Sequence, residues 1–460
     1  MINMNATAQI ICSGIIADDT IMISKALIRK WKIPHGQHIT LKFGSFKSYV
    51  KVIAAAQSNA VRISQALATQ MGLLTGGSSK LTLRLQYKSD PATLVLGPLI
   101  GVLISRDYPQ NAEKPFGSIT LFCRELVEGC KSQGAYVYFF TPNQLGGSMN
   151  QIAGWIYDGG WRQAAMPIPD IVNNRLTTRK LENLIGVQQF MSDVKLRHRT
   201  KIFNEKFLDK TEVFDALKKD ESLTRYLPES HLLRNYATLK MMCSRYNNVF
   251  LKPVRGSLGK GIIRLSRADS DNYHAMFATA SGTRKQQFSS LSKLYSTLSV
   301  KMKTVRYQVQ QGLQLIEIAK RPVDFRALVQ KNASGKWVIT SIVARTASGQ
   351  HFVSNLARGG TLSTVSAAVT KSNLQAGTGA TDASKRLRLA ALHIARGIET
   401  HIPYHFGELG IDLALDTHGR IWLLEVNSKP SKNENTPLSD RKIRPSVRMM
   451  IQYSRYLSGF

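Results

Sequence analysis

The stretch Phe406–Pro430 (FGELGIDLALDTHGRIWLLEVNSKP) constrains the fold of this chain more than any other. Apolar residues alternate on both sides of Asp416–Gly419, which predicts two β-strands joined by a tight turn. Because strand side chains repeat every two residues, Glu425 and Asn427 should share one face. Asp412 on the neighbouring strand could reach the same point. Two carboxylates and one amide oxygen suit a hard cation such as Mg²⁺.

The net charge is the unusual part of the composition. Lys and Arg total 62 against 30 Asp and Glu, which gives +32 and a pI near 10.1, whereas 43% hydrophobic and 20% charged residues are ordinary. Such a field attracts polyanions and steers anionic substrates. Nucleic acid, an acidic polymer and an acidic peptide are therefore candidate partners, although no nucleic-acid motif supports the first. A solvated basic surface without a dedicated partner is an equally good interpretation.

Cysteine spacing and hydropathy indicate the compartment. The four cysteines (Cys12, Cys123, Cys130 and Cys243) show no CxxC spacing, which argues against a zinc site or a disulfide framework and fits a reducing compartment. The first twenty residues lack a basic region followed by an apolar core, and no apolar run reaches 18 residues. We therefore expect a cytoplasmic protein without a membrane partner.

An internal repeat of about forty residues organises the N-terminal part. Ile23–Phe43 matches Ile63–Leu85, and each copy reads as Ile-Ser-x-Ala-Leu opening a short helix, then a glycine turn and an alternating strand. Two units that cannot bury their own apolar faces predict a pseudo-symmetric, β-barrel-like module over residues 1–93. It holds no cluster of acids, bases or metal ligands, so we interpret it as a binding or scaffold domain.

An α/β domain is expected over residues 94–195, followed by a larger α+β domain over residues 196–460. Leu94–Ser105 reads as one continuous buried strand of the parallel kind, followed by a helix at 118–133 and a strand at Ala135–Phe140. Pro169–Arg175 would be another strand ending in polar residues, where α/β sheets place their clefts.

A glycine-rich loop follows a hydrophobic strand in Asn248–Leu265 (NVFLKPVRGSLGKGIIRL). Successive backbone N–H groups in such a loop form an anion-binding nest, and lysine charge would assist it. The loop is not a Walker A motif, since the GKS/T ending and the following helix are missing. An exposed, basic β-hairpin is the alternative. The residues concerned are Lys252, Arg255, Gly256, Ser257, Gly259, Lys260 and Gly261.

Two arginines on neighbouring strands form a third element. Asp324 and Arg326 lie two residues apart on a strand that begins near Val323, and the next strand delivers Arg345. Burying these guanidinium groups requires an anionic partner. Salt bridges of Asp324 with either arginine are one possibility, and contact with a transferring phosphoryl group is the other.

In chain order these elements resemble the ATP-grasp superfamily and, in detail, the YheC/YheD-like ATP-grasp proteins of spore-forming bacteria. The resemblance covers nearly the whole chain and implies a pre-ATP-grasp domain, then an ATP-grasp fold with a lid at about residues 200–305. It implies that ATP is bound by Lys206, with Lys210 as a competitor, by the lysine and glycine-loop residues above, and by an adenine hinge at Gln310, Gln311 and Leu313. It further implies that Arg326 and Arg345 hold phosphate and the activated carboxylate near Asn355, and that Asp412, Glu425 and Asn427 bind magnesium.

By this resemblance the leading hypothesis is an Mg-ATP-dependent ligase. Such an enzyme activates a carboxylate as an acylphosphate for attack by an amine or similar nucleophile, here with an unknown substrate. The alternatives are an ATP-binding spore-coat protein without turnover and a basic polyanion-binding protein.

Overall fold

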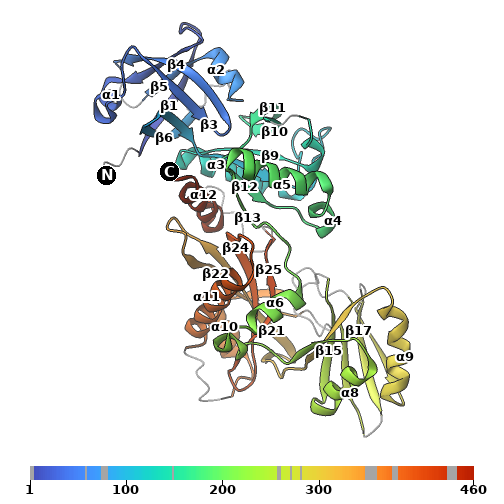
Figure 1. Cartoon of the computed structure of the whole chain (residues 1–460). Coiled ribbons are helices and arrows are strands. Elements are labelled where there is room, and N and C mark those ends of the chain that lie inside the picture. The colour runs from blue at the N-terminus through green and yellow to red at the C-terminus, as the bar shows by residue number, and fades with distance from the viewer. Residues whose placement is uncertain are drawn as a thin grey trace.

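The computed structural model describes residues 5–56, 60–73, 81–147, 150–255, 261–269, 272–279, 282–347, 360–375, 382–431 and 443–460. Figure 1 shows an elongated chain with the N-terminal barrel at one end and a strand-rich subdomain with two flanking helices at the other. The C-terminal helix α12 (Pro445–Ser458) turns back onto α3 (Thr120–Gln133), so the C-terminus lies near the barrel.

The first seven strands form a closed barrel in the order β1-β5-β2-β4-β3-β7-β6. Their bounds are β1 Asn5–Ser13, β2 Thr20–Ser24, β3 His38–Phe43, β4 Phe46–Ala55, β5 Ala60–Ser64, β6 Leu81–Ser89 and β7 Ala92–Gly97. The two repeat copies place α1 (Lys25–Trp31) after β2 and α2 (Gln65–Gln70) after β5. Ser24 and Ser64 accept hydrogen bonds from the N–H groups of Leu27 and Leu67, so the repeated serine starts each helix.

The stretch Leu94–Ser105 is two strands, so the prediction of one continuous strand was wrong. β7 pairs with β3 and β6 inside the barrel, whereas β8 (Leu99–Leu103) pairs in parallel with β9 (Tyr136–Phe140) and β12 (Ile171–Asn174). Between them, Gly97 has φ +151° and Pro98 has no N–H to donate to a ladder. The sequence is apolar throughout because both strands are buried, each in a different sheet.

The second sheet has the order β11-β10-β9-β8-β12-β13. The strands not yet given are β10 Gln151–Tyr157, β11 Trp161–Pro167 and β13 Lys201–Phe203, and the helices near them are α4 Arg179–Glu182 and α5 Ile185–His198. The parallel strands β8, β9 and β12 carry the predicted α/β layer. Domain boundaries at residues 93 and 195 remain predictions, and the barrel itself runs to Gly97.

The rest of the chain forms two further sheets that frame the candidate site. The first, which we call the lid sheet because most of it falls within the predicted lid, has the order β14-β19-β15-β16-β17-β18, with bounds Ser230–Leu232, Tyr307–Gln311, Asn248–Pro253, Ile263–Arg267, Tyr273–Thr279 and Gly282–Phe288. One face of it forms a core that includes residues of α8 (Tyr236–Arg245) and α9 (Leu291–Met302). The other face carries Lys252 and Gln310.

The base sheet has the order β23-β22-β21-β24-β25, with bounds Thr361–Ser363, Trp337–Thr346, Arg321–Lys331, Glu408–Leu415 and Ile421–Asn427, and β20 (Glu317–Ile318) pairs with β21. Its core includes residues of α6 (Lys210–Leu217), α7 (Glu221–Thr224), α10 (Val365–Lys371) and α11 (Ala383–His401). Together the four sheets confirm the predicted mixed, multidomain fold class with an N-terminal barrel. In the part of the chain that the structure describes, no helix combines the length and the apolar character needed to span a membrane.

Candidate nucleotide and metal site

The β24–β25 hairpin forms as the sequence predicts. Asp412 and Glu425 are directly opposite each other, and Asn427 lies two residues further along β25. The turn is fixed by the Asp416 carboxylate, which accepts from the backbone N–H groups of His418 and Arg420. The three predicted metal ligands therefore lie close together at one end of the hairpin, although their metal-binding role stays a prediction.

Lys210, rather than Lys206, reaches this hairpin. Asp209 caps helix α6 by accepting from the N–H of Glu212 at 2.8 Å, which puts Lys210 in the first turn. The Lys210 Nζ then lies 3.3 Å from Glu425 Oε2. Lys206 instead pairs with Glu212 at 2.6 Å and lies over the ring of Tyr404. The spacing Asp209-x-x-Glu212 is the sequence signal that could have ranked Lys210 first.

Lys252 approaches the same point from the lid sheet. It donates a hydrogen bond to Gln310 Oε1, and Gln310 in turn donates to the Ser230 hydroxyl at 3.0 Å. Burial and the neighbouring Lys210 ammonium lower the pKa of Lys252 to about 8, while Glu425 opposes the shift. Lys210 is thus paired with Glu425, and Lys252, whose own hydrogen bond goes to Gln310, lies near enough to both groups for their charges to affect its pKa. Among the described residues, Glu425 is the one carboxylate found beside these two ammonium groups, and such an excess of positive charge suits an added anion.

The glycine loop is placed only in part. Arg255 is exposed where the loop begins and Gly261 resumes the chain at φ +73°, whereas Gly256, Ser257, Gly259 and Lys260 lie outside the described residues, as does Asn355.

In the hinge, the Gln311 N–H donates to Glu229 O and the Gly312 N–H donates to Asn248 O, both at 2.9 Å, and Leu313 is half-buried. A side chain at Gly312 would lie 2.5 Å from that Asn248 oxygen. The glycine therefore lets the chain cross closely from the lid sheet to the base sheet.

Arg326 and Arg345 form a buried cluster with two aspartates. Arg326 binds both oxygens of Asp412, and Arg345 binds Asp324 through two hydrogen bonds and Asp412 at 3.0 Å. These four side chains are at most 10% exposed. Burial alone would raise the pKa of Asp412, but the two guanidinium groups hold it at about 2. The contacts match the salt-bridge interpretation for Arg345, and a role toward phosphate stays a prediction for both arginines.

The donor set fits a magnesium ion that keeps other oxygen ligands. Glu425 is 28% exposed, Asn427 is half-buried, and three of about four lone-pair positions of Asp412 already accept from guanidinium groups. Among the described residues, no group of three His, Cys, Asp or Glu side chains gathers at one point. A site built on one or two carboxylates and an amide, completed by phosphate and water oxygens, is typical of nucleotide-bound Mg²⁺.

Of the described histidines near these motifs, His405 is structural and His418 is solvent-exposed. His405 contacts Ile202 O and the Tyr453 hydroxyl, and burial lowers its pKa. His418 lies in the exposed turn, and His351 is outside the described residues. Sequence reasoning missed Glu182 and Lys429, which form a buried ion pair close in sequence to Asn427. For Lys429, its place two residues after Asn427 was the available signal, and Glu182 had none.

Comparison with known proteins agrees with this architecture. Residues 199–457 match the model of the YheC/D like ATP-grasp family. The chain is 28% identical over 368 residues to the endospore coat-associated protein YheD of Bacillus subtilis, covering 80% of each chain. It is 23% identical over 321 residues to YheC of the same organism, covering 68% of this chain and 85% of the relative.

Two solved ligase structures resemble this chain at lower sequence identity. The VanG D-Ala:D-Ser ligase from Enterococcus faecalis has a TM-score of 0.46 and 12% identity, over 79% of this chain and 99% of that one. D-alanyl-alanine synthetase A from Vibrio cholerae has a TM-score of 0.45 and 13% identity, over 79% and 98%. The family model spans more than half of the 460 residues, and the chain therefore belongs to the YheC/D-like ATP-grasp family.

Proposed function

We propose that this protein is an Mg-ATP-dependent ligase that activates a carboxylate as an acylphosphate for attack by an amine or similar nucleophile. The observation that carries the proposal is the Lys210–Glu425 ion pair beside Asp412, with Lys252 of the other sheet near it, in a chain of the ATP-grasp family. The phosphates of ATP carry negative charge that cations must neutralise, and here the cations come from both the lid sheet and helix α6, which packs against the base sheet.

In the proposed reaction a substrate carboxylate oxygen attacks the γ-phosphorus, and the bond from that phosphorus to the β,γ-bridging oxygen breaks to release ADP. The nucleophile then adds to the acyl carbon, the C–O bond to phosphate breaks, and phosphate carries away the proton. Lys210 and Lys252 would neutralise phosphate charge, while Glu425, Asn427 and Asp412 would hold magnesium. The bound ion would neutralise charge that develops on the phosphoryl oxygens. The Gln310–Leu313 hinge would hold adenine.

Release of ADP and phosphate from Mg-ATP tests this proposal. The protein is assayed with and without pooled amino acids and small carboxylates, beside Lys252→Met as the binding-deficient control. Stimulated release that the variant loses supports the ligase, and dividing the pool identifies the substrate. If no pool, including acidic peptides and polymers, stimulates release above the variant's rate, the ligase proposal fails.

A second candidate is an ATP-binding protein of the spore coat that has no turnover. Its support is the description of YheD and YheC as endospore coat-associated. This candidate predicts calorimetric binding of Mg-ATP without ADP release in any substrate mixture.

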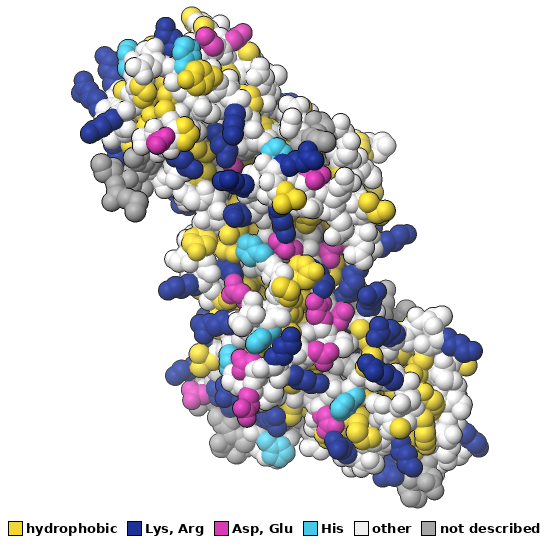
Figure 2. Space-filling view, in the orientation of Figure 1, with side chains coloured by type: hydrophobic (Ala, Val, Ile, Leu, Met, Phe, Trp, Pro, Cys, Tyr) yellow, Lys and Arg dark blue, Asp and Glu magenta, His cyan; other side chains and the backbone are white. Residues whose placement is uncertain are grey.

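Polyanion binding is a weaker candidate that rests on the charge of +32. On the face in Figure 2, Lys and Arg side chains are spread over the barrel, the α/β layer and both lower sheets rather than gathered into one patch. An affinity for single-stranded nucleic acid or polyglutamate that falls steeply with salt would support this candidate.

A further inference from the structure

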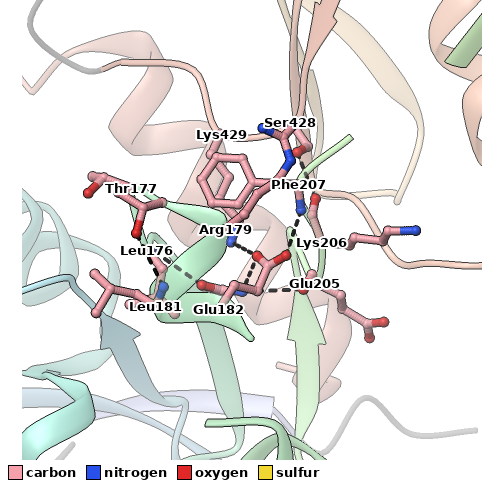
Figure 3. A network of polar contacts seen from close by, with 12 residues as sticks. Leu176, Thr177, Arg179, Leu181, Glu182, Glu205, Lys206, Phe207, Ser428 and Lys429 are labelled. Atoms are coloured by element: carbon pink, nitrogen blue, oxygen red, sulfur yellow. Dashed lines mark hydrogen bonds and ion pairs between the residues drawn. The ribbon is translucent and has the colours of Figure 1, made fainter. Parts of the chain in front are cut away.

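Glu182, at the end of helix α4, lies at the centre of a buried polar network behind the candidate site (Figure 3). The residue is 5% exposed. One carboxylate oxygen accepts from the backbone N–H of Phe207 at 2.9 Å. The other pairs with the Lys429 ammonium and accepts from the Asn174 amide at 3.4 Å. A single carboxylate thus contacts strand β12, eight residues before it, and two segments further along the chain.

Lys429 is held on a second side by an aromatic ring. Its side chain is 3% exposed, and its ammonium lies 4.4 Å from the centre of the Phe207 ring. The neighbouring Ser428 hydroxyl accepts from the Leu208 N–H at 3.3 Å and donates to Lys206 O at 2.7 Å. The segments 206–208 and 428–429 are therefore joined to each other as well as to Glu182 (Figure 3).

Both segments lead directly into the candidate site. Phe207 precedes Lys210 by three residues, and Lys429 follows Asn427 by two. Lys210 and Glu425 are themselves 3.3 Å apart. Glu182 belongs to neither side of that contact and lies outside residues 199–457, which match the ATP-grasp model. It comes from the α/β layer, so one carboxylate of this layer contacts both the segment that precedes Lys210 and the segment that follows Asn427.

We propose that Glu182 is a positioning residue for the nucleotide site: it fixes the segments that carry Lys210 and Asn427 relative to each other. The proposal rests on the function proposed above, because it concerns the binding of Mg-ATP. Replacing Glu182 by Gln keeps the size of the side chain and an acceptor for Phe207. It leaves the Lys429 side chain buried without an anionic partner, which proteins relieve by loss of the proton, which abolishes the ionic link, or by local rearrangement. That rearrangement would displace both segments.

Glu125 supplies a matched control. It accepts from the Arg444 N–H at 2.6 Å and pairs with the Arg444 guanidinium at 2.7 Å, and the two side chains are 9% and 10% exposed. Like Glu182 it joins the α/β layer to a distant segment through one backbone N–H and one buried cation. It connects α3 to α12, not to the segments of Lys210 and Asn427. Glu125→Gln therefore reproduces the loss of a buried ion pair away from the site.

The experiment compares wild type, Glu182→Gln, Glu125→Gln and the double variant Glu182→Gln/Lys429→Met. Calorimetry measures Mg-ATP affinity, and hydrogen exchange without nucleotide measures protection of residues 205–210 and 425–429. Since groups that orient metal ligands typically contribute about 10–100-fold, Glu182→Gln should bind at least about tenfold more weakly. Its two segments should exchange faster. Glu125→Gln should match wild type in both measurements, and the double variant should regain most of the affinity because no unpaired charge remains.

Two results would overturn the inference: wild-type affinity and protection in Glu182→Gln, or equal losses in Glu125→Gln. A wild-type protein that fails to bind Mg-ATP would refute the proposed nucleotide site instead. In that case the exchange data still decide whether Glu182 holds the two segments together.

Discussion

Replacing Asp412 by Asn should lower the free energy of unfolding of the base sheet by about 3 kcal/mol at neutral pH. The cluster holds two arginines and two aspartates, so the change leaves one positive charge in excess among side chains that are at most 10% exposed. The pKa of Asp412 is about 2, against about 3.9 for an unperturbed Asp. At about 1.4 kcal/mol per pKa unit this difference corresponds to about 2–3 kcal/mol. Breaking a buried ion pair typically costs about 3–5 kcal/mol.

Native-state hydrogen exchange on the β21 and β24 amides measures this loss locally. Because the folded pKa lies below the unfolded one, the contribution is complete above about pH 5 and is lost as pH falls towards 2. The gap between wild type and Asp412→Asn should be constant from pH 5 to 8. Asp193→Asn, which breaks an exposed pair with Arg197, should change stability by less than about 0.5 kcal/mol. A loss below about 1 kcal/mol for Asp412→Asn would refute the reasoning.

Three further predictions concern nucleotide binding and the hinge. Lys210→Met should weaken Mg-ATP binding at least about tenfold in calorimetry, since a charge-assisted contact contributes about 1.5–3 kcal/mol. Lys206→Met should change the affinity by no more than about twofold. Equal effects of the two substitutions would contradict the placement of Lys210. Mg-ATP affinity should fall by up to about tenfold per pH unit above pH 8, because Lys252 of the unliganded protein then loses its charge and binding must take up a proton. The proton uptake is detected as a binding heat that depends on the buffer. Lys252→Arg should abolish this pH dependence, and a pH dependence that persists in the variant would assign the effect to another group. Gly312→Ala should destabilise the protein by about 1–3 kcal/mol and lower the melting temperature by several degrees, because the Cβ of the alanine would lie 2.5 Å from Asn248 O. An unchanged melting temperature would contradict this close approach.

Local patterns predicted much of the fold. The repeated Ser24 and Ser64 signals, the alternation in the last hairpin and the apolar runs of the α/β layer all correspond to observed elements. The division at Gly97–Pro98 was missed because an apolar run is the same whether one sheet or two bury it. Hydropathy does not specify where the chain leaves the barrel and enters the second sheet.

The sequence predicted which residues belong to the candidate site, but not all of the contacts between them. Strand alternation brought Asp412, Glu425 and Asn427 together correctly, since they are separated by one hairpin. The choice between Lys206 and Lys210 depended on the start of a helix. The salt bridge of Asp324 with Arg345 was among the predicted possibilities, but the pairing of both arginines with Asp412 depended on the order of strands. Such long-range neighbours arise from topology, which spacing along the sequence does not specify.

The most direct test of the central claim is a calorimetric titration with ATP, with and without magnesium, of wild type and Glu425→Gln. The account predicts that magnesium strengthens binding to wild type, and that Glu425→Gln keeps the circular dichroism spectrum of wild type but loses this gain. Equal gains from magnesium in the two proteins, or no binding to wild type at all, would contradict an Mg-ATP site beside Lys210, Lys252 and Glu425.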